Sequence, residues 1–186
     1  MKNHEESQSK EIEQAVKILR SGGVVIFPTD TVYGIGCRYD FPHSVQRIKN
    51  IKKSTQNFPV LIVNINQAHK LANMTPSAMH LVNKHWPGGL TILVHKKSDE
   101  EKIGLRIPAS DLVISIINRL QVPIIGTSAN FHRQPSVTKF ENLDERLVKL
   151  ADYVIKGECI YKVESTVVDA TVNPVKILRE GLVKIR

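Results

Sequence analysis

The stretch VVIFPTDTVYGIGCR, residues 24–38, carries the strongest structural signal in this sequence. It begins as a run of β-branched and aromatic residues, which predicts a strand buried on both faces. Pro28 ends this strand because proline has no N–H to donate to a neighbouring strand. A loop of hydroxyl residues, Asp30, Tyr33 and two glycines follows. Such a loop after a buried strand is where open α/β sheets bind ligands, although an ordinary hydrogen-bonded turn is an equal alternative here.

The bulk composition is typical of a globular protein. The chain has 186 residues, of which 41% are hydrophobic and 24% charged, and we therefore expect a single domain over residues 1–186. No apolar run is long enough to cross a bilayer, and residues 1–10 are too polar for a signal peptide, so we expect a cytoplasmic protein with no membrane partner. Cys37 and Cys159 fit reduced thiols in that compartment.

The charge balance favours a polyanionic partner. Lysine and arginine number 26 against 18 acidic residues, which gives a formal net charge of +8. Such an excess suits either nucleotide phosphates or an RNA backbone and does not choose between them. A solvated positive face is the alternative for any single lysine.

Helical and strand patterns alternate along the chain, which predicts an α/β sheet with helical cover. Thr75 and Pro76 are typical of a helix start, and Thr138 with Glu141 has the spacing of a capping box. Lys49, Lys52 and Lys53 are expected on one helix face. The expected helices cover residues 5–20, 42–53, a short stretch from 66, 76–86, 111–120 and a segment ending at 150. The expected strands cover residues 24–27, 60–65, 90–95, 103–108, 122–126, 165–170, 176–179 and 182–185.

Several common kinds of site are excluded by motif. The glycines after the first strand lack the third glycine of the dinucleotide pattern, and the chain has no Walker A sequence. Its histidines and cysteines lack zinc-ligand spacing, and no G-x-S-x-G elbow is present. The remaining polar candidates are mostly donors and cations, among them Arg106 between apolar neighbours, which meets a carboxylate or phosphate in most such settings. This inventory favours binding an anionic ligand over general base chemistry.

Several segments, taken together and in order, resemble the YrdC family, the threonylcarbamoyl-AMP synthases of tRNA modification. Lys52 would open the family's Lys-x-Arg element. The other matching segments are PTDTVYGIG (28–36), WPGGLTILV (86–94), LRIP (105–108), TSAN (127–130), ESTVVD (164–169) and LREG (178–181). The length is similar to that of the short, single-domain members.

The resemblance implies a twisted mixed α/β sheet with a basic concave cavity. It also implies a nucleotidyltransferase that makes threonylcarbamoyl-AMP and pyrophosphate from L-threonine, bicarbonate and ATP. A downstream threonylcarbamoyl transferase complex would then modify adenosine 37 of tRNA. Magnesium would arrive with ATP, and we expect no tightly bound cofactor and no dedicated metal site.

The resemblance also implies roles for individual residues. The chemistry would depend most on Lys52 and Arg106, with Arg106 paired to the threonine carboxylate. The expected L-threonine contacts are Thr29, Arg106, Ser128 and Ser165, and the expected ATP contacts are Lys52, Asn130, Thr138 and Arg179. Thr138 could equally be only a helix cap, and Ser165 only the start of a strand.

One departure from the family pattern keeps other functions open. Ser54 stands where the family has an arginine, and the following segment has Phe58 and no basic residue. Lys49 or Lys53 could supply the missing charge. Otherwise the chain could be a paralogue with a different acceptor, or a non-catalytic module of the same fold that binds double-stranded RNA or tRNA.

Overall fold

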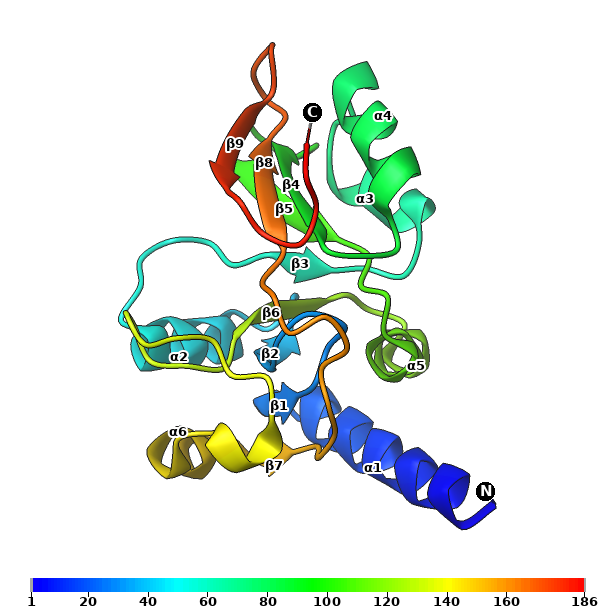
Figure 1. The fold of residues 1–186 in the computed structure, drawn as a ribbon, viewed down its shortest axis with the longest axis vertical. Helices are drawn as coiled ribbons and strands as arrows, with labels where there is room; N and C mark the ends of the chain where they lie inside the picture. Colours follow the sequence, from blue (N-terminus) through cyan, green and yellow to red (C-terminus); the bar gives the residue numbers. More distant parts are fainter. Residues whose placement is uncertain (1, 186) are drawn as a thin grey trace.

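The computed structural model describes residues 2–185, so the ends of the expected 1–186 domain, residues 1 and 186, lie outside the described part. The described chain forms one nine-stranded mixed sheet with helices packed on it, which confirms the predicted α/β class (Figure 1). The strand order is β7-β1-β2-β6-β3-β5-β4-β8-β9. The strands are β1 (Val25–Phe27), β2 (Gly34–Arg38), β3 (Val60–Leu61), β4 (Leu90–His95), β5 (Lys102–Arg106), β6 (Ile124–Ser128), β7 (Tyr153–Val154), β8 (Thr166–Asp169) and β9 (Lys176–Arg179).

Six α-helices and one 3-10 turn connect these strands in the described residues. Apolar residues at helical spacing on α1 (Lys2–Arg20) and α5 (Asp111–Leu120) bury one face of each helix, with the side chains of Ala15, Leu19 and Ile116 fully buried. The predicted start of α4 (Pro76–His85) is confirmed, since Thr75 Oγ1 accepts from the Ala78 backbone N–H and Pro76 is the first helical residue. The helices are α1 (Lys2–Arg20), α2 (Pro42–Lys52), α3 (Ile65–Leu71), α4 (Pro76–His85), α5 (Asp111–Leu120), α6 (Glu145–Leu150) and the 3-10 turn η1 (Phe140–Asn142).

The sheet mixes both kinds of strand pairing. β1 and β2 form an antiparallel hairpin, and β2 continues antiparallel to β6 with Gly36 opposite Gly126. β3 pairs antiparallel with β6 but parallel with β5, and β4 is antiparallel to β5 and parallel to β8. Strands from the second half of the chain, such as β5 and β6, therefore belong to the same sheet as β1 and β2. Their residues can contact the polar loop that follows β1.

Three expectations about secondary structure are wrong. Gly34 and Gly36 do not belong to the loop after β1 but to strand β2, because the backbone of β6 approaches Gly36 too closely for a side chain there. Thr138 and Glu141 form no capping box, because residue 139 is held in an isolated β-bridge to Glu158 and only the 3-10 turn follows. Helix α6 starts later, where Asp144 accepts from the Arg146 backbone N–H. Residues 182–185 form no strand, since β8 already has β4 and β9 as neighbours and Val183 bonds to the hydroxyl of Thr166 instead.

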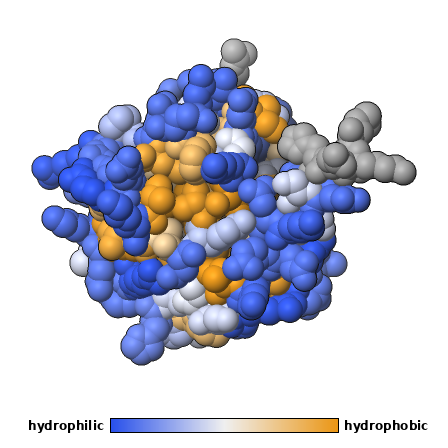
Figure 2. Space-filling view, turned by 90° about the horizontal axis from the view of Figure 1, so that it is seen from below, coloured by the Kyte–Doolittle hydropathy of each residue, from blue (hydrophilic) through white to orange (hydrophobic). Residues whose placement is uncertain are grey.

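No helix in residues 2–185 is long and apolar enough to cross a bilayer. Figure 2 views the end of the molecule that carries α1 and α6, where hydrophobic residues form patches among hydrophilic ones. Large hydrophobic residues that are exposed in the described chain include Ile160 and Leu178. Of these, Leu178 lines the main cavity.

Candidate functional site

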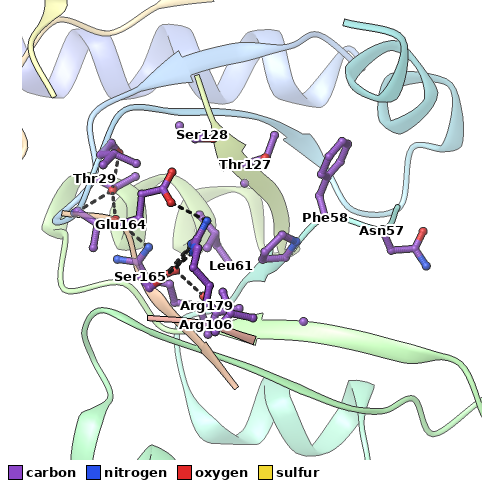
Figure 3. A pocket seen from close by; sticks show the side chains of 18 of the residues that line it. Thr29, Asn57, Phe58, Leu61, Arg106, Thr127, Ser128, Glu164, Ser165 and Arg179 are labelled. Atoms are coloured by element: carbon purple, nitrogen blue, oxygen red, sulfur yellow. Dashed lines mark hydrogen bonds and ion pairs between the residues drawn. The ribbon is translucent and has the colours of Figure 1, made fainter. Parts of the chain in front are cut away.

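A cavity of about 820 Å³ opens on one face of the sheet (Figure 3). Side chains or backbone from β1 to β6, β8 and β9 line it. Its volume lies toward the upper end of the range of about 300–1,000 Å³ typical of ligand sites. The cavity can therefore hold an amino acid and part of a second ligand at once.

Hydroxyl groups gather at one end of this cavity. Thr29 Oγ1 donates to the Val32 carbonyl at 2.7 Å and accepts from the Thr31 backbone N–H at 3.0 Å, as an Asx-like turn would. At the same end, the Ser165 and Thr91 hydroxyls lie 2.9 Å apart and are both buried. Figure 3 shows Thr29 and Ser165 on the same side, away from Phe58 and Asn57. The predicted threonine contacts Thr29, Arg106, Ser128 and Ser165 all line the cavity.

Arg106 lies at this hydroxyl-rich end and is held on three sides. Its Nη2 pairs with Asp30 Oδ1 at 2.6 Å, its Nη1 donates to Thr31 Oγ1 at 2.9 Å, and its Nε donates to the Gly88 carbonyl at 2.9 Å. Burial lowers the pKa of Arg106 and the Asp30 carboxylate opposes that effect, so the guanidinium stays charged. With five N–H groups, the side chain keeps two for a ligand.

The carboxylate of Asp30 is fully buried, and its Oδ2 has no hydrogen-bond partner among the described residues. A buried carboxylate is costly unless it is paired. Arg106 is therefore both a structural partner for Asp30 and a donor at the cavity surface, a double role that the sequence did not reveal.

Arg179 enters the same end from β9. Its Nη1 lies 2.8 Å from Glu164 Oε2, and its Nε and Nη2 donate to the Ser165 carbonyl at 3.1 and 2.9 Å. The other oxygen of Glu164 accepts from Ser136. Figure 3 shows the carboxylate of Glu164 turned toward Arg179. With 44% of its side chain exposed, Arg179 has room to turn toward a ligand.

Lys52 lies behind the cavity wall and does not line the cavity. Its Nζ donates to the Ser128 carbonyl at 2.8 Å and to both the backbone carbonyl and the Oδ1 of Asn130 at 2.6 Å. Burial lowers the pKa of Lys52 to about 8. The ammonium group fixes the backbone of the segment 127–130, whose Thr127 and Ser128 do line the cavity.

The other predicted ATP contacts are divided. Arg179 lines the cavity, whereas Asn130 and Thr138 do not. Asn130 accepts from Lys52 and from the Ser128 hydroxyl at 2.7 Å, so its amide serves the same segment. Whether these residues contact a nucleotide stays a prediction.

The three lysines expected on one helix face differ in their surroundings. Lys52 is buried, while Lys53 is exposed in a left-handed conformation with φ of 47° that ends the helix. Lys49 donates to Asn57 Oδ1 at 3.1 Å. Ser54 does not line the cavity, and neither Lys49 nor Lys53 reaches it. The wall near Ser54 is formed by the uncharged residues Gln56, Asn57 and Phe58.

Sequence reasoning missed three charged residues of the cavity wall: Glu101, Lys102 and Glu164. For Lys102 a signal was available, because residues 102, 104 and 106 alternate along one strand and must share a face. Among the side chains of residues 6–185 no three histidine, cysteine or acidic groups are placed to hold a metal ion.

Comparison with known proteins gives one family. The model of the Sua5/YciO/YrdC family, described as "Telomere recombination", matches residues 17–181. A protein of Bacillus subtilis named threonylcarbamoyl-AMP synthase is 33% identical over 184 residues, which cover 92% of this chain and 53% of that protein.

Solved structures agree with this match. P. abyssi Sua5 complexed with L-threonine is 32% identical with a TM-score of 0.84, over 91% of this chain and 54% of that one. E. coli YciO is 26% identical with a TM-score of 0.84, over 92% of this chain and 89% of that one. The chain thus spans about half the length of the B. subtilis and P. abyssi proteins and nearly all of YciO. From its matching segments, its sheet and these likenesses, the chain belongs to the Sua5/YciO/YrdC family.

Proposed function

We propose that this protein is an L-threonylcarbamoyladenylate synthase, a nucleotidyltransferase that forms threonylcarbamoyl-AMP and pyrophosphate from L-threonine, bicarbonate and ATP. The observation that carries the proposal is the cavity, which joins two arginines and the hydroxyls of Thr29 and Ser165 at one end and leaves room for a second ligand. The names of the B. subtilis and P. abyssi relatives and the bound L-threonine of the latter support the same activity. The product would serve tRNA modification through a downstream transferase complex.

The reaction requires little acid–base chemistry from the protein. The amine of threonine combines with bicarbonate to give a carbamate and water, and a carbamate oxygen then attacks the α-phosphorus of ATP. The new oxygen–phosphorus bond forms as the bond to the β-phosphate breaks, and pyrophosphate leaves with the electron pair. The nucleophile comes from the substrate, so catalysis rests on holding the two anions in line and offsetting their charge.

The hydroxyl-rich end is the part of the cavity that suits the amino acid. The two free N–H groups of Arg106 suit a carboxylate, and Thr29 and Ser165 offer hydroxyls to the threonine side chain. Arg179, which lines the same end with 44% of its side chain exposed, suits the phosphates of ATP. Lys52 and Asn130 would act through the segment 127–130 that they fix. Magnesium enters this proposal only as the companion of the phosphates of ATP.

The test is pyrophosphate release measured with all three substrates and with each one omitted. We expect release only with threonine, bicarbonate and ATP together. Arg179→Gln should lower the rate about tenfold to a hundredfold, because a charged hydrogen bond contributes about 1.5–3 kcal/mol. Arg146→Gln is the matched control, since Arg146 lies on α6 outside the cavity with 73% of its side chain exposed. Release that does not depend on threonine would refute the assignment.

The net charge of +8 and the uncharged Ser54 favour a second candidate, a non-catalytic module that binds tRNA or double-stranded RNA. That function predicts RNA binding with a steep salt dependence and no adenylate formation. A paralogue with another acceptor is the third reading, and it predicts pyrophosphate release with a different amino acid or amine in place of threonine.

A further inference from the structure

The cavity has a second end that carries its own cation. Along β5, Lys102, Gly104 and Arg106 line the cavity, whereas Ile103 and Leu105 are buried in the core on the opposite face. Four residues at about 3.3 Å each place the Cα atoms of Lys102 and Arg106 about 13 Å apart along the strand. The cationic side chains of Lys102 and Arg106 are therefore separated along the length of the cavity.

The register of β3 fixes what else lies at the Lys102 end. β3 is parallel to β5 with Val60 opposite Leu105, so the chain that precedes β3 runs toward the start of β5. A Cβ built on Gly104 would lie 3.4 Å from the Pro59 Cα, which confirms how closely the two segments approach. The residues before Pro59 that line the cavity, Gln56, Asn57 and Phe58, are uncharged. Positive charge at this end comes from Lys102.

Asp169 is the carboxylate that pairs with Lys102, and the carboxylate of the adjacent Glu101 pairs with another lysine. Asp169 Oδ2 lies 2.7 Å from the Nζ of Lys102, and the Glu101 carboxylate is taken by Lys96 at 2.6 Å. The other oxygen of Asp169 accepts from the hydroxyl and the backbone N–H of Thr171. An ammonium group has three N–H donors, so the bond to Asp169 orients Lys102 and leaves two for a ligand. The side chain is 42% exposed and within reach of a ligand in the cavity.

We propose that Lys102 binds the pyrophosphate portion of the nucleotide and neutralises the charge that grows on it as it leaves. This inference rests on the proposed function. In an in-line displacement the nucleophile and the leaving group lie on opposite sides of the α-phosphorus. An amino acid held by Arg106 and the hydroxyls of Thr29 and Ser165 at one end therefore directs the leaving pyrophosphate toward the other end, where Lys102 lies. Lys102 then supplies the charge that Ser54 and Phe58 do not.

The test is binding of inorganic pyrophosphate, ATP and L-threonine by calorimetry to the wild type and to Lys102→Gln. We expect Lys102→Gln to bind pyrophosphate and ATP about tenfold or more weakly, since one charged hydrogen bond is lost, while its affinity for threonine stays within about twofold. Lys102→Arg should recover most of the loss. Lys97→Gln, an exposed lysine in the loop before β5 that does not line the cavity, should behave as the wild type.

The outcomes separate this inference from the proposed function. Unchanged pyrophosphate affinity in Lys102→Gln, no pyrophosphate binding by the wild type, or an equal loss of threonine binding would each overturn the role of Lys102. Pyrophosphate binding that depends on Lys102 in a protein that releases no pyrophosphate from ATP would support the site and refute the synthase. Unfolding curves of Lys102→Gln and Lys102→Arg show how much the pair with Asp169 contributes to stability. A purely structural role of Lys102 would change these curves and leave the ligand affinity of the folded protein unchanged.

Discussion

Breaking the buried pair between Arg106 and Asp30 is expected to destabilise the protein strongly. Arg106→Met removes the partner of a carboxylate that is fully buried and whose Oδ2 already lacks a hydrogen bond. It also leaves the Gly88 carbonyl and the Thr31 hydroxyl without their donor. Removing one member of a buried ion pair costs about 3–5 kcal/mol, a large part of the stability of a domain of this size.

A double-mutant cycle on Arg106 and Asp30 measures their coupling energy and tests the pair more directly than either single variant. Asp30→Asn keeps the shape of the side chain and removes its charge, which leaves Arg106 buried without a counterion. Combining Asp30→Asn with Arg106→Met removes both charges, so the double variant should lose at least about 2 kcal/mol less than the sum of the single losses. Urea unfolding followed by fluorescence of the single tryptophan, Trp86, suits this cycle, because Trp86 lies two residues before Gly88.

Arg38 and Asp40 provide a matched control, since they form a pair of the same chemistry and the same 2.6 Å separation with Asp40 43% exposed. Arg38→Met should cost at most about 1 kcal/mol. Our interpretation is that the buried pair holds the loop after β1 against the turn before β4. It would be refuted if the losses of unfolding free energy in the two single variants simply added in the double variant, or if Arg106→Met lost no more stability than Arg38→Met. Arg106 would then be free for a ligand alone.

Two further predictions concern buried titratable groups. Burial lowers the pKa of Lys52 to about 8, which is below its pKa in the unfolded chain. Between these two pKa values the unfolded chain binds more protons than the folded protein, so the stability contributed by Lys52 rises with pH. The difference in unfolding free energy between wild type and Lys52→Met should grow by up to about 3 kcal/mol from pH 7 to pH 10.5, whereas Lys53→Met should show no such trend. Burial raises the pKa of Cys37 to about 12 and also raises that of Cys159, so neither thiol should react with iodoacetamide at pH 8 until the protein unfolds, and rapid labelling of the native protein would contradict this.

Local signals in the sequence were sufficient for most of the fold. The buried run from Val24 and the stop at Pro28 give β1, and the start of α4 at Thr75 and Pro76 follows from capping chemistry within four residues. The failures occur where a contact distant in sequence decides the outcome. Thr138 had the spacing of a cap, but the bridge from Lys139 to Glu158 holds this part of the chain extended.

The candidate site was predictable as a set of segments and not as a set of contacts. Thr29, Arg106, Ser165 and Arg179 do meet in one cavity, as their motifs suggested. What the sequence could not show is that Arg106 pairs with a residue 76 positions away, or that Lys52 turns its ammonium group to backbone carbonyls and not to the cavity. Such pairings depend on strand register, which no local pattern encodes.

These pairings bear on how the cavity recognises its ligand. Each cation that lines it already has a carboxylate beside it: Asp30 for Arg106, Glu164 for Arg179 and Asp169 for Lys102. The net charge of +8 is therefore carried largely elsewhere on the chain, and the cavity offers oriented N–H groups more than a strong field. Recognition by oriented donors predicts that threonine binding depends weakly on salt, whereas RNA binding through the rest of the surface would depend on it steeply. The synthase and the RNA-binding module therefore predict different salt dependences of ligand binding, because each cation of the cavity already has a carboxylate beside it.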